Sequence, residues 1–450
     1  MMTNKHWGSL LRPVVLRVAM LTVGVGVAAA IGVQAGLGLA GAKVSAATST
    51  SPIVIRMYTG FESNEPIINQ YLQMYEKSHP GIKVENLGSE WDVNKLTTLF
   101  AAGQAPDIIQ HSTDYIQQLY RQGFVAAVPT ELADRLRQKF YPVLLQAVLV
   151  QGRLAGVPTE NMVTGLWYNN RVLDEAGIAS QPATFTDLEK IGLRLSKFAG
   201  DGRRERAGLV EQGEWWSFNQ FGWATFKALG GQVIDATTGK LVVDGQPLRD
   251  LLEIVPRWIG AKGFMGQGWD QVTAFFKGEV PYGFGYLWWS TLIRENNPSN
   301  YLKTFGVGLY PKGAGGNGAL HYAHAYAVNS KSKHADEAWK LLEWLALQPV
   351  DGVTPLGHAL SAKSLPVNSD DFQAKYYDAF RPWAAGFIAN LQYAWNDSQF
   401  VSYGIGPGDL DFATAMWSVR DGKANPAQAV EDLVTKAQNK IKQFQAAQGK

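Results

Sequence analysis

Within residues 53–160 the sequence repeats a strand–helix–strand pattern, and this pattern most limits the folds open to the chain. Apolar runs rich in β-branched residues alternate with stretches whose apolar residues recur at helical spacing. Strands that alternate with helices predict an open α/β sheet. Open α/β sheets of this kind bind ligands at the carboxyl ends of their strands. The predicted strands begin at Ile53, Ile82 and Asp107, and the helices between them end at His79 and Gly103.

A second α/β region follows the first. Leu166–Asn169 and the glycine-containing run Gly278–Tyr286 are predicted strands, separated by helical segments rich in aromatic residues. Another alternating strand is expected at Ala323–Asn329, before a strongly periodic helix at His334–Leu347. The last helix is predicted to have Pro426 in its first turn. The predicted fold class is therefore α/β, with two regions that exchange segments several times.

The first 46 residues have the composition of a secretory signal peptide. Lys5, Arg12 and Arg17 precede an uncharged run, Val18–Ala42, which is rich in Ala, Val and Gly, and small residues up to Ala46 provide a cleavage site. We therefore predict that residues 1–46 are a signal peptide and that the rest of the chain is periplasmic or extracellular. The apolar run is also long enough to cross a bilayer, so an uncleaved membrane anchor is the alternative.

The composition excludes several classes of function. The chain contains no cysteine, which excludes disulfides, thiolate metal sites, thiol nucleophiles and a lipid-modified N-terminal cysteine. Of the 41 basic residues, Lys5, Arg12, Arg17 and Lys43 lie in the predicted signal peptide, so 37 remain against 39 acidic residues. This balance does not suggest nucleic acid or anionic lipid as a partner. At 450 residues, 46% of them hydrophobic, the chain can bury two cores.

The sequence carries no cofactor, metal or catalytic motif. The glycine-rich run Gly313–Gly318 lacks the Gly-Lys-Ser/Thr ending of a phosphate-binding loop, so we interpret it as a surface loop. Zinc-type His-Glu-x-x-His, calcium-loop spacing and the Gly-x-Ser-x-Gly nucleophile elbow are all missing. We therefore expect no cofactor and no metal.

Six groups of motifs, taken in order, resemble the family 1 extracellular solute-binding proteins, the maltose-binding-like receptors of ABC importers. Each motif alone consists mostly of turn and packing residues, so the resemblance rests on their order and on coverage of almost the whole mature chain. The first motifs are Tyr75-Glu76-Lys77-x-His79-Pro80-Gly81-Ile82-Lys83-Val84-Glu85 and Ala101-Ala102-Gly103-x-Ala105-Pro106-Asp107-Ile108. Next come Gly156-Val157-Pro158 with Gly165-Leu166-Trp167-Tyr168-Asn169 and Glu175-Ala176-Gly177-Ile178. The last are Leu229-Gly230-Gly231-x-Val233-Ile234-Asp235, Phe276-x-Gly278 and Ser330-Lys331-Ser332-Lys333-His334-x-Asp336-Glu337-Ala338-Trp339.

The resemblance implies a periplasmic-binding-protein type II fold, in which two α/β lobes close on a ligand around crossing segments. It also implies a monomeric receptor that passes a small-molecule ligand to the transmembrane permease subunits of an ABC importer. Many Gram-positive relatives carry a lipobox cysteine, which this chain lacks, so a soluble receptor is expected and not a lipoprotein. The implied lobes are residues 47–160 with 323–365 and residues 161–322 with 366–450. The implied crossings lie near Glu160–Val163, Tyr322–Ala325 and Lys363–Asn368.

The predicted ligand is a carbohydrate, because the sequence supplies both kinds of group that sugars need. Sugars present apolar C–H faces, which stack on aromatic rings, and hydroxyl edges, which pair with carboxylates or amides. The 15 tryptophans are many for this length, and several fall in predicted loops. The candidate ligand-binding residues of the first lobe are Phe61, Glu62, Glu90, Trp91, His111, Thr113, Asp114 and Glu160. Those of the second lobe and the crossings are Trp215, Trp216, Trp288, Trp289, His324 and Trp395.

Several of these residues also have a structural interpretation. Trp167 and Trp339 lie within strand and helix patterns, and we predict that both are core residues. Of the adjacent pairs Trp215-Trp216 and Trp288-Trp289, one ring of each is expected to point inward and the other toward the cleft. The candidate acids could instead be surface residues or helix caps, and His324 could be a hydrogen-bonded residue of the hinge.

The expected function is that of a sugar receptor that is not an enzyme. Other functions stay open. A carbohydrate-active enzyme such as a glycosidase would need two carboxylates ~5–10 Å apart, which Glu62, Glu90, Asp114 and Glu160 could supply. A sensory or adhesion module would use the same binding chemistry with another partner. The same receptor fold could serve a polyol or a glycerophosphodiester, although a phosphate would require Arg or Lys in the cleft.

Overall fold

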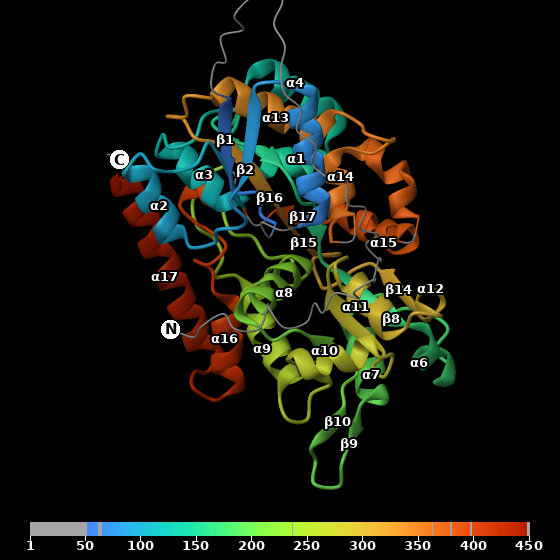
Figure 1. Ribbon diagram of the computed structural model, residues 1–450. Helices are drawn as coiled ribbons and strands as arrows, with labels where there is room; N and C mark the ends of the chain where they lie inside the picture. Colours follow the sequence, from blue (N-terminus) through green and yellow to red (C-terminus); the bar gives the residue numbers. More distant parts are fainter. Residues whose placement is uncertain are drawn as a thin grey trace, which may run out of the picture. The chain divides into compact units, whose positions relative to one another are not determined.

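The computed structural model describes residues 52–61, 65–235, 237–361, 363–378, 380–396 and 398–447. They belong to one compact unit, Ser51–Lys450. The predicted signal peptide, residues 1–46, lies outside the described residues. Two five-stranded sheets form the framework of this unit (Figure 1). We call each sheet, with the helices that cover it, a lobe.

The sheet of the first lobe has the strand order β2-β1-β3-β16-β6. β1 (Ile53–Met57), β2 (Ile82–Asn86) and β3 (Ile108–Ser112) confirm the three predicted strands, and they are parallel. Helices α1 (Pro66–Ser78) and α2 (Val93–Ala101) connect these strands. β16 (His324–Val328), which comes from much later in the sequence, lies antiparallel between β3 and β6 (Val157–Pro158).

The sheet of the second lobe follows the same plan, with the order β12-β11-β13-β8-β14. β11 (Leu209–Glu211), β12 (Met265–Gln267) and β13 (Tyr282–Gly285) are parallel. β8 (Gly165–Asn169) is inserted antiparallel between β13 and β14 (Phe305–Gly308). Helices α8 (Trp215–Ala228), α10 (Trp269–Phe276) and α11 (Trp289–Asn296) follow the three parallel strands.

The segments implied as crossings lie side by side. β7 (Met162–Val163) pairs with β15 (Ala319–Tyr322), while β6 pairs with β16, so two neighbouring extended segments run from one lobe to the other. β17 (Ala394–Asn396) adds a third strand beside β15. The third implied crossing, near Lys363–Asn368, lies beside the first, because the Leu365 N–H donates a hydrogen bond to the Asn161 carbonyl. The exact boundaries of the lobes along the chain stay predictions.

The connection between β6 and β8 brings the carboxyl edges of the two sheets together. β6 ends at Pro158, opposite Ala325, which in turn pairs with His111 at the carboxyl end of β3. β8 begins at Gly165, opposite Gly285, the last residue of β13. Seven extended steps separate Pro158 from Gly165, and each spans about 3.5 Å, so the two edges lie within about 25 Å. Loops from both edges can therefore reach one ligand.

Each lobe has its own hydrophobic interior. In the first lobe, α1 and α13 (Ala335–Leu347) cover the sheet, and Trp339 is buried there. Trp167 of β8 is fully buried in the second lobe, so both predictions of core tryptophans are confirmed. The last helix, α17 (Pro426–Ala447), begins at Pro426 as predicted and packs on α9 (Gln246–Ile259) and α16 (Phe412–Arg420). Among the described residues, none of the helices combines the length and the apolar character needed to cross a bilayer.

Candidate functional site

Aromatic and ionisable side chains gather at the carboxyl edge of the first sheet. We call this group the first cluster, and it consists of Phe61, Trp91, His111, Glu160 and His324. The Trp91 ring, on the loop after β2, has its centroid 5.3 Å from that of His111 and 4.9 Å from that of His324. Trp91 is nevertheless 46% exposed. Two imidazoles therefore support the indole while much of its surface stays open to a ligand.

Glu160 and His324 form the polar centre of the first cluster. His324 Nδ1 donates to Glu160 Oε2 at 2.7 Å, and His324 Nε2 lies 2.6 Å from the Tyr322 hydroxyl. Burial opposes ionisation of Glu160, but the charge and hydrogen bond of His324, together with the charge of Lys363, outweigh it and lower the pKa of Glu160. The Lys363 ammonium also lies 5.4 Å from the centroid of the Phe61 ring. The Glu160 carboxylate is therefore ionised at neutral pH.

His111 is a neutral member of the cluster. Burial lowers its pKa to about 4, and the charge of His324 acts in the same direction. The Ser112 N–H donates to His111 Nδ1 at 2.8 Å, so the proton of the neutral ring resides on Nε2. Asp114, in the first turn of α3 (Thr113–Arg121), also belongs to this edge. Burial raises the pKa of Asp114, although hydrogen bonds from Ser112 and Tyr115 oppose the shift.

Tryptophans follow all three parallel strands of the second sheet. Trp215 and Trp216 begin α8 after β11, Trp269 begins α10 after β12, and Trp288 precedes α11 after β13. Trp215, Trp216 and Trp269 are 43%, 37% and 39% exposed, and Trp288 is half-buried. Large exposed indoles are unusual on a soluble surface, and a group of them marks an interaction site.

A single carboxylate links two of these indoles. Glu214 Oε2 accepts from Trp216 Nε1 at 2.7 Å, and Glu214 Oε1 accepts from Trp269 Nε1 at 2.9 Å. The Trp269 and Trp288 ring centroids lie 6.2 Å apart, with an interplanar angle of 45°. We call Glu214, Trp216, Trp269 and Trp288 the second cluster. Trp215 stands beside it and donates from Nε1 to Asp411 Oδ1 at 2.8 Å.

The expectation for adjacent tryptophans was right for one pair and wrong for the other. Trp289 is fully buried against Phe275 and Phe276, while Trp288 is partly open. Trp215 and Trp216, in contrast, are both exposed. They occupy the first two positions of α8, where both side chains can project beyond the body of the lobe.

The remaining candidates have structural partners, and Glu62 lies outside the described residues. Glu90 forms an ion pair with Lys95 and accepts from the Asp92 N–H at 3.1 Å. Thr113 is buried, and its hydroxyl lies 2.6 Å from that of Ser398. Trp395 is partly buried and packs on Phe226 and Phe400, with Lys227 over its ring. The assignment of these residues to ligand binding stays a prediction.

Sequence reasoning missed Glu214, Trp269, Tyr322 and Lys363. Trp269 directly follows Gly268, the residue at which the chain leaves β12. That strand has only three residues, so its periodicity is too short to identify it. Tyr322 and Lys363 could have been noted from the crossings implied near them, but nothing in the sequence shows their partners.

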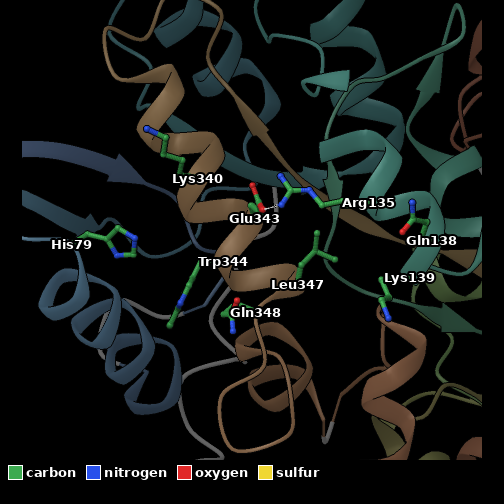
Figure 2. A pocket seen from close by; sticks show the side chains of 9 residues that line it. All are labelled: His79, Arg135, Gln138, Lys139, Lys340, Glu343, Trp344, Leu347 and Gln348. Atoms are coloured by element: carbon green, nitrogen blue, oxygen red, sulfur yellow. Dashed lines mark ion pairs between the residues drawn. The ribbon is translucent and has the colours of Figure 1, made fainter. Parts of the chain in front are cut away.

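A separate cavity of about 470 Å³ lies on the first lobe (Figure 2). It is bounded by α4 (Thr130–Lys139), α13 and the residue after α1, and an ion pair between Arg135 and Glu343 crosses it. It contains no residue of either cluster. The lining residues are His79, Arg135, Gln138, Lys139, Lys340, Glu343, Trp344, Leu347 and Gln348.

Known proteins share this architecture. A putative binding protein of Brucella abortus (strain 2308) is 24% identical over 417 residues, covering 90% of this chain and 97% of that protein. The putative ABC transporter periplasmic-binding protein YcjN of Escherichia coli (strain K12) is 26% identical over 254 residues, 53% of this chain and 56% of its own length. The structure of the sugar-binding protein MalE from Xanthomonas citri has a TM-score of 0.73 at 16% identity, covering 88% of this chain and 99% of that one.

The fold is thus that of the type II periplasmic binding proteins, as the resemblance implied. Residues 62–350 match the sequence profile of a family described as bacterial extracellular solute-binding protein. This match spans well over half of the chain. The chain belongs to the bacterial extracellular solute-binding protein family, with maltose-binding proteins among its structural neighbours.

Proposed function

We propose that this protein is the extracytoplasmic receptor of an ABC importer, and that it captures a neutral oligosaccharide between its lobes. The observation that carries the proposal is the second cluster, whose exposed or half-buried indoles follow every parallel strand of the second sheet. Indole rings suit the apolar faces of sugars. Trp91 and the Glu160 carboxylate of the first cluster supply a further ring and acceptors for hydroxyl groups.

The charges at the site favour a neutral ligand. Glu160 is hydrogen-bonded to His324 and lies near the charge of Lys363, and Glu90 forms an ion pair with Lys95. An anionic ligand such as a glycerophosphodiester would need a cation that is free to bind phosphate. The charge of Lys363 already acts on Glu160, and its ammonium lies over the Phe61 ring, which argues against that alternative.

The proposed mechanism is closure of the lobes over the ligand. A sugar stacked on the second cluster gains contacts with the first cluster only when the lobes close, so binding favours the closed state. Each buried sugar hydroxyl must find a partner, because an unpaired one costs ~1–3 kcal/mol. The closed receptor would then deliver its ligand to the permease subunits as a monomer.

The names of the relatives support this assignment. The Escherichia coli relative is named as a periplasmic-binding protein of an ABC transporter, and the Xanthomonas citri structure as a sugar-binding protein. By the same reasoning we propose that the protein is periplasmic or extracellular, exported by residues 1–46, and that it does not cleave its ligand.

Thermal unfolding of the purified protein with a panel of neutral sugars tests the proposal. Glucose, maltose, maltotriose, mannose and mannotriose are suitable members, and each is recovered afterwards and analysed by mass spectrometry. A bound sugar raises the melting temperature by mass action, equivalent to about 2.7 kcal/mol at a hundredfold excess over Kd. A shift with intact sugar is expected. Shortened sugar would instead indicate a glycosidase, and no shift with any sugar would contradict the carbohydrate assignment.

A further inference from the structure

We infer that Glu214 is a positioning residue that holds Trp216 and Trp269 as one platform, so that the site selects sugar chains over single sugars. The inference rests on the proposed function and deepens it, since it names the length of the sugar chain as the property that the site recognises. It comes from the geometry of one carboxylate between two indoles, extended by a third ring, Trp288.

Glu214 joins two loops that are distant in the sequence. Trp216 lies two residues from Glu214, whereas Trp269 lies 55 residues away, at the start of α10. The Glu214 carbonyl accepts the Phe218 N–H and the Ser217 hydroxyl, so its backbone is fixed to the first turn of α8. The carboxylate therefore extends from a rigid point, and its two oxygens set where both indoles lie.

A carboxylate suits this task better than its amide analogue. An ionised carboxylate only accepts hydrogen bonds, and it offers one oxygen to each indole N–H. Glutamine offers one acceptor and one donor, so its amide NH₂ would face an indole N–H that is also a donor. Hydrogen bonds to a charged acceptor are also about twice as strong as neutral ones. Glu214→Gln should therefore release one of the two rings.

The number of rings indicates the length of the ligand. One sugar ring has two faces, so it can stack on at most two aromatic rings. The second cluster presents three indoles on one lobe, and Trp91 adds an exposed ring on the other. Full coverage of these rings requires more than one sugar unit. Release of Trp269 or Trp216 should thus weaken the binding of a chain more than that of a monosaccharide.

Calorimetric titration of Glu214→Gln with glucose and maltotriose tests the inference, and mannose with mannotriose repeats it with a second sugar. For the wild type we expect the trisaccharide to bind ~10-fold or more tightly than the monosaccharide, and for Glu214→Gln we expect most of this preference to be lost. Glu189→Gln is the matched control, because Glu189 accepts from Trp258 Nε1 at 3.0 Å outside both clusters. It should leave the preference for the chain unchanged.

A second variant separates the hydrogen bond from the ring. Trp269→Phe keeps an aromatic ring but loses the N–H donor, so it should reduce the same preference. Combined with Glu214→Gln it should weaken binding by less than the sum of the two single effects, because both changes act on the contact between Glu214 and Trp269. In ¹H–¹⁵N spectra without ligand, Glu214→Gln should move the indole N–H signals of Trp216 and Trp269, whereas Glu189→Gln should not.

The outcomes distinguish this inference from the proposed function. A wild type that binds none of the four sugars contradicts both. A wild type that binds maltotriose and mannotriose no more tightly than the monosaccharides keeps the receptor function and overturns selection by chain length. A Glu214→Gln variant with unchanged indole signals and unchanged preference overturns the positioning role alone.

Discussion

His324 Nδ1 lies 2.7 Å from the Glu160 carboxylate, and this contact joins two chain segments that cross between the lobes. His324 begins β16, and Glu160 lies between β6 and β7. The same imidazole packs against Trp91, the exposed ring of the first cluster. A ligand that rests on Trp91 would therefore touch side chains held directly by the crossing segments, so in the proposed closure ligand binding and lobe movement would share one set of contacts.

Loss of the Glu160 charge should make stability less dependent on pH. The folded state lowers the pKa of Glu160 below its ordinary 4.5, so its contribution is complete above pH 4.5 and disappears as the pH falls through the folded value. Glu160→Gln should reduce the free energy of unfolding by ~1–3 kcal/mol at pH 7. Urea unfolding of the wild type and of Glu160→Gln at pH 7 and pH 4 measures this cost, which should be smaller at pH 4.

A suitable control for this variant is Glu85→Gln. Glu85 lies 3.4 Å from Arg56 in an ion pair whose side chains are about half exposed. Its loss should cost ~0–1 kcal/mol, because water screens exposed pairs. A Glu160→Gln cost that stays constant between pH 7 and pH 4 would show that the charge does not act as described.

Acidification should destabilise the protein partly through His111. Its folded pKa of about 4 lies below the ordinary 6.5, so between these values the unfolded state binds the proton and the folded state does not. The contribution of His111 to the free energy of unfolding is therefore fully present above pH 6.5. It falls by up to about 3 kcal/mol as the pH approaches 4. His111→Gln should remove this component.

The measurement is the difference in unfolding free energy between wild type and His111→Gln across this range. The difference between the two proteins is required because burial also lowers the pKa of His321, to about 3. His321 therefore makes the free energy of unfolding fall with decreasing pH in both proteins, as His111 does in the wild type. An NMR titration in which the His111 ring gains its proton near pH 6.5 would contradict the expectation.

Asn161 should be critical for the crossing region. Its buried side chain accepts from His321 Nε2 at 3.1 Å and donates to the Pro366 carbonyl at 3.1 Å. Asn161→Ala leaves both partners unpaired, and we expect the free energy of unfolding to fall by ~2–5 kcal/mol. Asn94→Ala, an exposed change in α2, should stay within ~0.5 kcal/mol. Equal costs for the two variants in urea unfolding would show that these bonds do not stabilise the crossing.

Truncation of an indole of the second cluster should weaken sugar binding. Trp216→Ala or Trp288→Ala should cost ~1–3 kcal/mol of binding free energy for a sugar that the wild type binds, which calorimetry measures directly. Phe198→Ala is the control, because Phe198 is a 38% exposed aromatic residue of β9 (Lys197–Phe198), outside both clusters. Unchanged affinity in both tryptophan variants would remove stacking from the proposal.

The local pattern of the sequence was sufficient to predict the three parallel strands of the first sheet and several of the longer helices. Strands β1, β2 and β3 and the helices between them follow from hydrophobic periodicity and from the glycines and prolines that interrupt it. Trp167 and Trp339 were placed in the core because they lie on the buried faces of regular elements. The positions and buried faces of these elements depend on residues close together in the chain, so they can be predicted from the sequence.

The arrangement of the site required the tertiary structure. Glu214 and Trp269 are 55 residues apart, and the three-residue strand that brings them together carries no periodic signal. Likewise, Glu160 and His324 meet only because β6 and β16 are neighbours in one sheet. The sequence by itself determined the α/β elements, the family and the types of side chain available for a ligand. Only the tertiary structure decided which of these side chains pair, because pairing depends on strand order and register between segments far apart in the chain.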